Sequence, residues 1–156
     1  MLNLTQHPDR LEITWEGRPL CTYVIRDDDP PHLFRRPYLH PVYTLDGDLV
    51  TDCRPADHPW HKGISMTMSV VNDQNFWGGP TYRDGQYVQL DNVGEVRHEG
   101  LRMIDTRDTG FFLEQQLSWM SAKGEKWFHE RRNIGINVLP ESNPFWTLDW
   151  NMEFEN

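Results

Sequence analysis

The stretch Trp146-Thr147-Leu148-Asp149-Trp150-Asn151-Met152-Glu153-Phe154 decides the fold class, because every second residue in it is large and apolar. Side chains of a β-strand point alternately to opposite faces, so this period of two predicts a strand with one face in a core. A similar alternation occurs over 111–119 and 128–138, where Gln115, Glu130 and Arg132 interrupt the apolar face, and over 64–70, with small polar residues on the other face. Four strands of this kind indicate a sheet that buries one side.

The alternation continues toward the N-terminus, over 11–15, where Leu11, Ile13 and Trp15 occupy every second position. A turn over 16–19 and a second strand over 20–25 complete the signature of a hairpin. No window shows the apolar spacing of a helix, and eleven Gly and eleven Pro divide the chain into short segments. We therefore predict an all-β protein, an antiparallel β-sandwich or barrel, as a single domain over 1–156.

Composition narrows the class of partner. The formal net charge of -9 and the lack of any basic run disfavour nucleic acid and anionic membrane surfaces. No apolar window is long enough for a membrane helix, and no phosphate loop, dinucleotide fingerprint or nucleophile elbow is present, so we expect no membrane partner and no cofactor. Cys21 and Cys53 are far apart and are expected to be free thiols, which favours the cytoplasm.

The densest group of reactive side chains lies in the segment Asp57-His58-Pro59-Trp60-His61-Lys62-Gly63. Pro59 has a fixed φ and restricts the residue before it, which favours a tight turn ahead of the next strand. In such a turn His58 and His61 would converge on one side, and Asp57 could orient one imidazole. The alternative is that both histidines only cap a loop and bond to its backbone.

Two other histidines are candidates. His40 lies between two prolines in the segment 36–41, which also carries Arg36 and Tyr38 as possible ligand contacts. His98 lies in the charged segment 94–100. For each histidine a packing or surface role is the competing interpretation.

The loop over 72–78 combines amides with aromatic rings. Asn75 and Trp77 suit carbohydrate recognition, in which a ring face stacks on the sugar and amides bond to its hydroxyl groups. The competing interpretation is that Phe76 and Trp77 both fold back into the core.

A metal site is a further alternative. His58, His61 and His98 would together satisfy a three-ligand catalytic zinc or iron site. No helical His-Glu-x-x-His motif is present to support it, so no metal is predicted.

Five stretches, in order along the chain, resemble motifs of the PmoA-like bacterial family of unknown function. The segment 57–63 is similar to that family's Asp-His-Pro-His-His-Arg-Gly motif, with Trp60 and Lys62 in place of a histidine and the arginine. The resemblance covers positions 30 to 156. The other four stretches are Arg36–Thr44, Asn72–Trp77, Gly94–His98 and Trp146–Trp150.

This resemblance implies a sandwich similar to the galactose-mutarotase-like supersandwich, in which histidines and a carboxylate on the concave sheet face handle a sugar. Members of the family are longer, so the sandwich is expected to be incomplete and truncated at its C-terminal side. The family's inherited name denotes a methane oxygenase subunit. Such a subunit spans the membrane, for which this sequence has no segment.

We therefore predict a carbohydrate-active or carbohydrate-binding protein with a His-rich concave site and a small sugar-like ligand. Proton transfer would come from His58, His61 and His98, since imidazole titrates near neutral pH. The expected ligand contacts are Arg36, Tyr38, His40, Asp57, Lys62, Asn75 and Trp77. The alternatives are a metal-dependent enzyme with histidine ligands, or a non-catalytic module that forms homo-oligomers through exposed strand edges.

Overall fold

The structure, a computed structural model, describes residues 1–156 and contains twelve β-strands, one 3-10 turn and no α-helix. Its sheets are antiparallel and none closes into a barrel, which confirms the predicted all-β fold. The elements are β1 (Leu2–Gln6), β2 (Arg10–Trp15), β3 (Arg18–Val24), η1 (Pro31–Leu33), β4 (Tyr38–Val42), β5 (Met68–Val71), β6 (Gln74–Phe76), β7 (Thr81–Arg83), β8 (Gln86–Val88), β9 (Glu95–Thr106), β10 (Gly110–Met120), β11 (Lys126–Leu139) and β12 (Phe145–Glu155).

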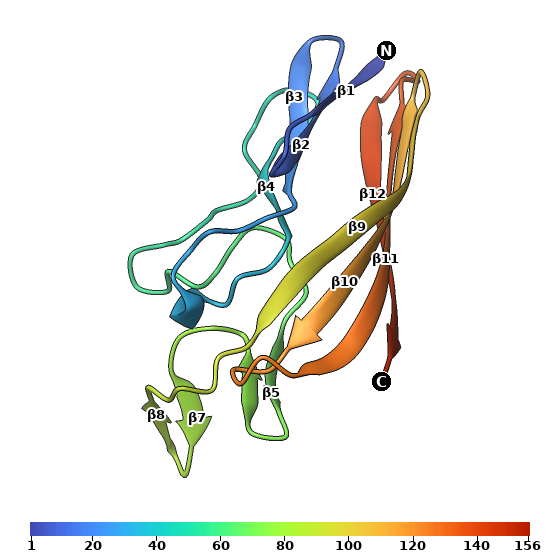
Figure 1. Ribbon diagram of the computed structural model, residues 1–156. Coiled ribbons are helices and arrows are strands. Elements are labelled where there is room, and N and C mark those ends of the chain that lie inside the picture. The colour runs from blue at the N-terminus through green and yellow to red at the C-terminus, as the bar shows by residue number, and fades with distance from the viewer.

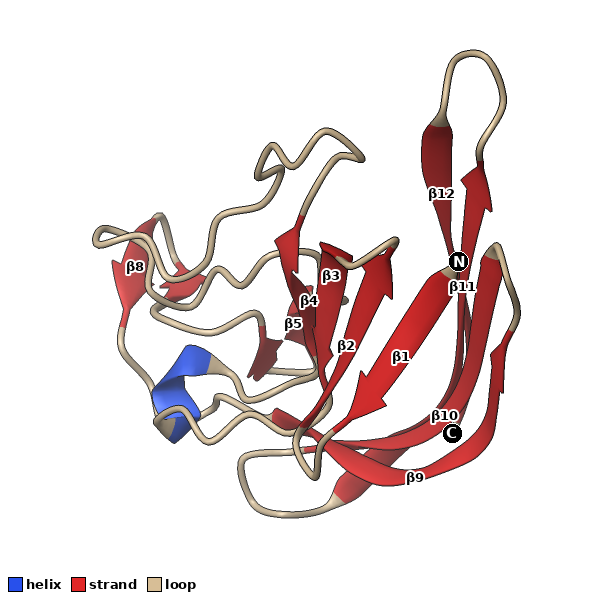
Figure 2. Cartoon of the chain, turned by 90° about the horizontal axis from the view of Figure 1, so that it is seen from above, coloured by secondary structure: helices blue, strands red, loops and turns tan.

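Two four-stranded sheets form a β-sandwich (Figure 1). The first has the order β1-β2-β3-β4 and the second has the order β12-β11-β10-β9. The second sheet is curved, and the first lies on its concave side (Figure 2). The buried side chains between them are Leu2, Leu11, Ile13, Leu20, Cys21, Tyr23, Ile25, Leu39, Val42, Phe111, Leu113, Ile134, Ile136 and Val138.

The period-two pattern explains which side chains enter this core. Phe111 and Leu113 of β10 and Ile134 and Ile136 of β11 are at most 4% exposed, while their chain neighbours point outward. Burial of one such side chain stabilises the fold by roughly 2 kcal/mol. The predicted strands over 111–119, 128–138 and 146–154 are confirmed as β10, β11 and β12.

A buried polar network crosses this core. The Arg132 guanidinium donates to both carboxylate oxygens of Glu130, at 2.5 and 2.9 Å, and to the Tyr23 hydroxyl at 3.2 Å. Tyr23 donates to the side chain of Gln115, and the Trp119 indole donates to Glu130 at 2.6 Å. Because each buried charge meets a partner, the network joins the two sheets without leaving a group unpaired.

A second, smaller core holds the irregular half of the chain against the sandwich. Phe34, Phe76, Val96, Leu117 and Trp119 form it, and all five are buried. Phe34 follows η1 and Phe76 ends β6, so the loops on both sides of these residues are fixed to the ends of β9 and β10. This core therefore positions the loops in the lower half of Figure 1.

The hairpin predicted over 11–25 is confirmed as β2 and β3, joined at Glu16 and Gly17 with φ of 50° and 79°. The strand predicted over 64–70 is corrected, because regular pairing begins only at Met68. Ile64 forms a single bridge with Leu39, after Gly63 has turned the chain with a φ of +43°. The backbone is thus diverted before the apolar alternation can pair.

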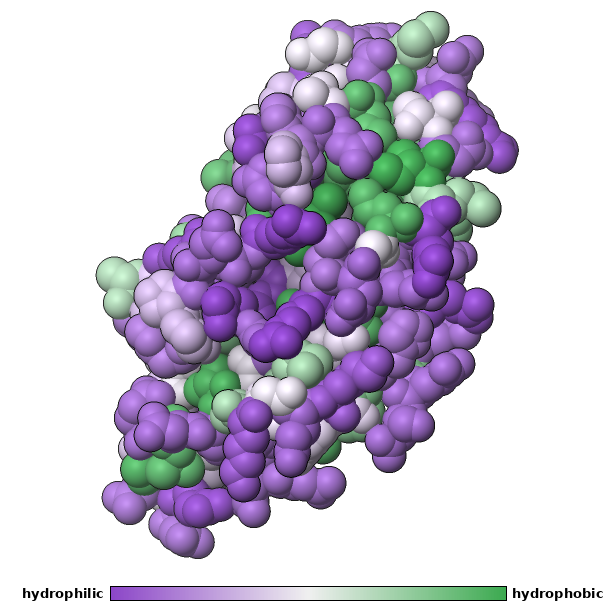
Figure 3. Space-filling view, in the orientation of Figure 1, coloured by the Kyte–Doolittle hydropathy of each residue, from purple (hydrophilic) through white to green (hydrophobic).

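Two features of the surface complete the description. Hydrophobic side chains reach the surface between the upper halves of the two sheets (Figure 3). The outer edge of β12 has no neighbouring strand.

The only helical element is one turn long, so no helix here has the length or apolarity needed to cross a lipid bilayer.

Candidate functional site

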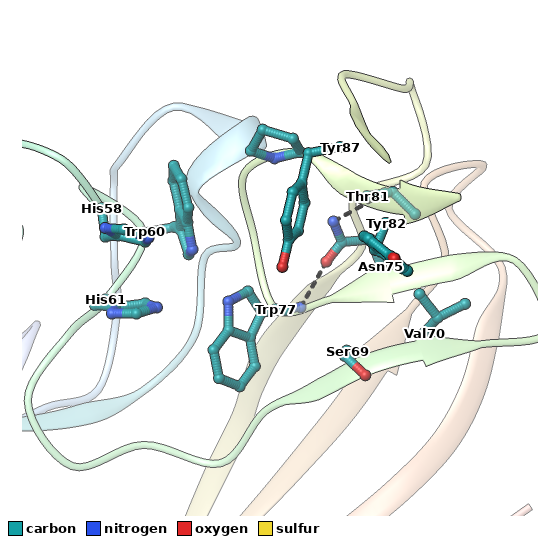
Figure 4. A pocket seen from close by; sticks show the side chains of 11 residues that line it. His58, Trp60, His61, Ser69, Val70, Asn75, Trp77, Thr81, Tyr82 and Tyr87 are labelled. Atoms are coloured by element: carbon teal, nitrogen blue, oxygen red, sulfur yellow. Dashed lines mark hydrogen bonds between the residues drawn. The ribbon is translucent and has the colours of Figure 1, made fainter. Parts of the chain in front are cut away.

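A cavity of about 540 Å³ lies beside the sandwich, between the loop over 57–63 and the strands β5 to β8 (Figure 4). It is built from loops and short hairpins. The sequence predicted a site on the concave face of a sheet. The cavity lies elsewhere, because β1 to β4 cover the concave side of the second sheet. The cavity is lined by His58, Trp60, His61, Ser69, Val70, Asn75, Trp77, Pro80, Thr81, Tyr82 and Tyr87.

The two histidines are brought together by a tight turn. The backbone N–H of His61 donates to the carbonyl of His58 at 2.9 Å, so Pro59 and Trp60 occupy the centre of the turn. The imidazole centres of His58 and His61 lie 5.1 Å apart, with 30° between the ring planes. Figure 4 shows them one above the other on the same side of the cavity.

Asp57 extends this pair. Its Oδ2 lies 3.0 Å from Nδ1 of His58, which lowers the pKa of Asp57 and leaves the other ring nitrogen of His58 without a protein partner. Burial, His58 and Arg36 together lower the pKa of His61 below 6.5. His61 is therefore neutral at pH 7, and a neutral imidazole can accept a proton.

Aromatic rings form the rest of the wall. The ring of Trp77 stands edge-on to His61 with centres 5.4 Å apart, and Trp60 stands edge-on to His58 at 5.1 Å. Trp60 also covers Gly79. Its indole N–H is buried and has no hydrogen-bond partner within the protein.

Asn75 fixes the position of Trp77. Its side-chain oxygen accepts the backbone N–H groups of Trp77 and Gly78 at 2.8 and 2.9 Å. Its NH₂ group donates to the carbonyl of Gly79 and to the hydroxyl of Thr81, both at 3.1 Å. The amide is thus fully used within the protein, and Asn75 shapes the cavity more than it offers hydrogen bonds to a ligand.

Phe76 and Trp77 point to opposite sides of the chain. Phe76 is fully buried in the smaller core, whereas Trp77 is 40% exposed in the cavity. Of the two rings that were alternatively expected to fold back into the core, Phe76 therefore does so and Trp77 does not.

Arg36 supports the turn that carries His58 and His61. Its guanidinium donates to the carbonyls of Phe34 and Trp60 and to the hydroxyl of Ser65, each at 2.9 Å. Burial lowers its pKa to about 10, so it remains charged at pH 7. The bond to the Trp60 carbonyl ties this buried cation to the centre of the turn.

Lys62 is buried in an ion-pair cluster. Its ammonium group contacts the carboxylate of Asp27 and lies 3.1 Å from that of Asp29. Arg54 donates to Asp29 at 2.5 Å and to the hydroxyl of Tyr38 at 3.2 Å. The predicted ligand contacts Lys62 and Tyr38 thus have protein partners, and they join the histidine loop to the segment over 27–29.

A smaller cavity, of about 210 Å³, adjoins the larger one. His61 and Trp77 line both, so the two cavities share one wall. The residues around the smaller cavity are Arg36, His61, Lys62, Gly63, Ser65, Thr67 and Trp77.

The remaining candidates lie elsewhere. Nδ1 of His40 pairs with the hydroxyl of Thr51 at 2.9 Å, and Nδ1 of His98 pairs with the Gln115 amide at 2.8 Å. Neither histidine lines the two cavities, and His98 faces a separate cavity of about 250 Å³ beside Arg26 and Arg97. No group of three or more His, Cys, Asp or Glu side chains is arranged to hold a metal ion.

Sequence reasoning missed the contribution of the β7–β8 hairpin. Tyr82 and Tyr87 face each other across it, with ring centres 5.1 Å apart, and both line the cavity. The turn between these strands is Asp84-Gly85, with φ of 50° and 86°. Such a dipeptide between two short runs is a hairpin signal, so this element was open to prediction. Trp60 was also missed as part of the cavity wall.

The fold and site define an antiparallel β-sandwich protein with a loop-built cavity of histidine and aromatic side chains. The family of unknown function DUF6807 matches residues 10–156, and the chain belongs to this family. Nothing in the match links the chain to a methane oxygenase subunit. No curated protein and no solved structure gives a significant match.

Proposed function

We propose that this protein binds a sugar in the larger cavity and that His58 and His61 act on it by proton transfer. The observation that supports this is the pairing of two imidazoles 5.1 Å apart with an aromatic wall in one cavity. Apolar faces of sugar rings stack on aromatic side chains, and hydroxyl groups need polar partners beside them. A volume of about 540 Å³ falls in the range of small-molecule sites.

The roles follow from the geometry. Trp77 would stack on the sugar, since its ring is half-exposed and its backbone N–H is held by Asn75. Asp57 would hold Nδ1 of His58, so that its other nitrogen gives or accepts a proton at the ligand. His61, neutral at pH 7, would act as the second proton acceptor.

Titration with monosaccharides tests the proposal, with tryptophan fluorescence and saturation-transfer NMR as readouts. We expect binding by the wild type, loss with Trp77→Ala, and no change with the control His7→Ala in the β1–β2 turn. Exchange between sugar anomers, followed by NMR, tests proton transfer. His58→Ala and His61→Ala should slow it, and His98→Ala tests whether the third predicted histidine contributes. Binding that survives Trp77→Ala undiminished would contradict the proposal.

Two free cysteines support a reducing compartment, and we propose the cytoplasm.

A second candidate function is self-association. The outer edge of β12 presents unpaired backbone groups, and Phe145 and Phe154 on this strand are 52% and 38% exposed. Strand edges of this kind pair with other strands. A sedimentation experiment that finds monomer at every concentration would exclude it.

A further inference from the structure

The smaller cavity is lined by hydrogen-bond donors. Arg36 and Lys62 carry cationic groups, Ser65 and Thr67 carry hydroxyls, and no Asp or Glu is among the lining residues. The Lys62 ammonium is already paired with Asp27 and Asp29, but Arg36 can only donate, the two hydroxyls can donate as well as accept, and no carboxylate lines the cavity. This lining favours a ligand group that accepts, such as an anionic oxygen.

Arg36 is the unusual member of this set. Its side chain is 3% exposed, yet its three bonds go to a hydroxyl and two carbonyls, and no carboxylate lies within 4.0 Å of its guanidinium. A buried guanidinium whose hydrogen bonds all go to neutral groups is costly, and an anion bonded to it reduces that cost. Of five guanidinium N–H groups, these bonds occupy three and leave two without a protein partner.

Arg36 differs from its cationic neighbours in its ion pairing. Lys62 and Arg54 form salt bridges with Asp27 and Asp29, whereas no salt bridge to Arg36 is present. Arg36 lines the smaller cavity only, together with His61 and Trp77, which line both cavities.

We infer that the ligand is an acidic sugar, whose anionic group enters the smaller cavity while its ring rests against Trp77 in the larger one. This inference rests on the proposed sugar-binding function and names the substrate class. A carboxylate is the group that best matches the planar fork of Arg36, which makes uronic acids the first candidates. Sulfate and phosphate esters of sugars share the same chemistry.

Binding of glucuronate and galacturonate is compared with binding of glucose and galactose by calorimetry, at low and high salt. We expect the acids to bind at least about tenfold more tightly, because a charge-assisted hydrogen bond is gained. High salt should weaken only the acids. Sugar phosphates and sulfates form a second arm that tells which anionic group is preferred.

The matched variants are Thr67→Asp and Thr67→Val, which leave Arg36 and its loop contacts in place. Thr67→Asp puts a carboxylate in the cavity and should abolish the preference for acids, whereas Thr67→Val should keep it. Arg36→Gln should also abolish it, and Arg107→Gln, in the exposed turn between β9 and β10, is its control.

The outcomes separate the two proposals. Equal binding of acidic and neutral sugars, still dependent on Trp77, would overturn the acidic-sugar inference and leave the sugar site standing. Binding of no sugar at all would overturn both. Acetate or inorganic phosphate competing as well as a uronate would show an anion site without a sugar, and would also overturn the inference.

Discussion

The indole of Trp60 lies directly on Gly79, where a Cβ atom would come within 2.5 Å of the ring. No real side chain tolerates that distance, so any residue other than glycine at position 79 has to displace the indole. Because Trp60 stands at the centre of the turn that pairs His58 with His61, this contact links the shape of the cavity to a single glycine.

Gly79→Ala should therefore disturb the cavity. We expect a loss of sugar binding, together with a destabilisation of about 1–2 kcal/mol from the left-handed backbone, whose φ is +62°. Gly124→Ala is the matched control, since Gly124 has a φ of +81° but open space around it. Gly124→Ala should lose a similar amount of stability in urea unfolding, from the backbone alone, and should still bind the sugar. Equal binding by both variants would contradict the prediction.

The neighbouring residues Phe76 and Trp77 should separate stability from binding. Phe76→Ala empties a fully buried position, so we expect about 3–5 kcal/mol less stability by urea unfolding. Trp77→Ala removes a half-exposed ring and should change stability by much less while abolishing sugar binding. A stability loss as large as that of Phe76→Ala would make Trp77 a packing residue.

Two glutamates of the adjoining strands β11 and β12 should differ in how much they contribute to stability. Glu130 is bonded to Arg132 inside the sandwich, and Glu130→Gln should destabilise the protein by about 3–5 kcal/mol, because Arg132 is left as an unpaired buried charge. Glu153 pairs with Arg131 on the exposed face, and Glu153→Gln should cost less than about 1 kcal/mol. Chemical unfolding of both variants measures the difference, and equal effects would contradict the prediction.

Acid should weaken the fold in two steps. Burial lowers the pKa of His40, His61 and His98 below 6.5, so the folded state binds fewer protons than the unfolded state just below that pH. Stability contributed by these neutral imidazoles is complete above pH 6.5 and is lost as the pH falls toward their folded pKa values.

The second step belongs to the carboxylates. Burial opposes the shift at Asp29, but bonds from Arg54 and Lys62 lower its pKa below 3.8, so its contribution is lost only in stronger acid. Urea midpoints measured from about pH 2 to about pH 8 should fall first below about pH 6.5, with a shallower slope in His61→Gln, and again in acid below the ordinary pKa of an aspartate. An unchanged slope in that variant would show that His61 does not contribute.

The predictable part of the fold is the part with one buried face. Phe111, Leu113, Ile134 and Ile136 alternate because their strands have one side in the core, and that pattern is visible in the sequence. β9 was not recognised, because its pairing with β10 shifts register twice and both of its faces are partly exposed. A bulged strand of this kind has no regular period to detect.

The site was predictable where local geometry decides it. Pro59 alone favours the turn that brings His58 to His61. Sequence gives no comparable signal that Lys62 is occupied, since its partner Asp27 is 35 residues away. Whether a cationic side chain binds a ligand or a carboxylate of its own chain depends on long-range packing. The spacing of residues in the sequence does not predict such packing.

The buried contact between Lys62 and Asp27 also bears on how a ligand is received. Both side chains are at most 1% exposed, so the loop that carries the histidines is fastened before any ligand arrives. A site already in shape loses little conformational entropy on binding. Recognition should then be a rigid fit, with rapid association and with selectivity expressed mainly in how long the ligand stays.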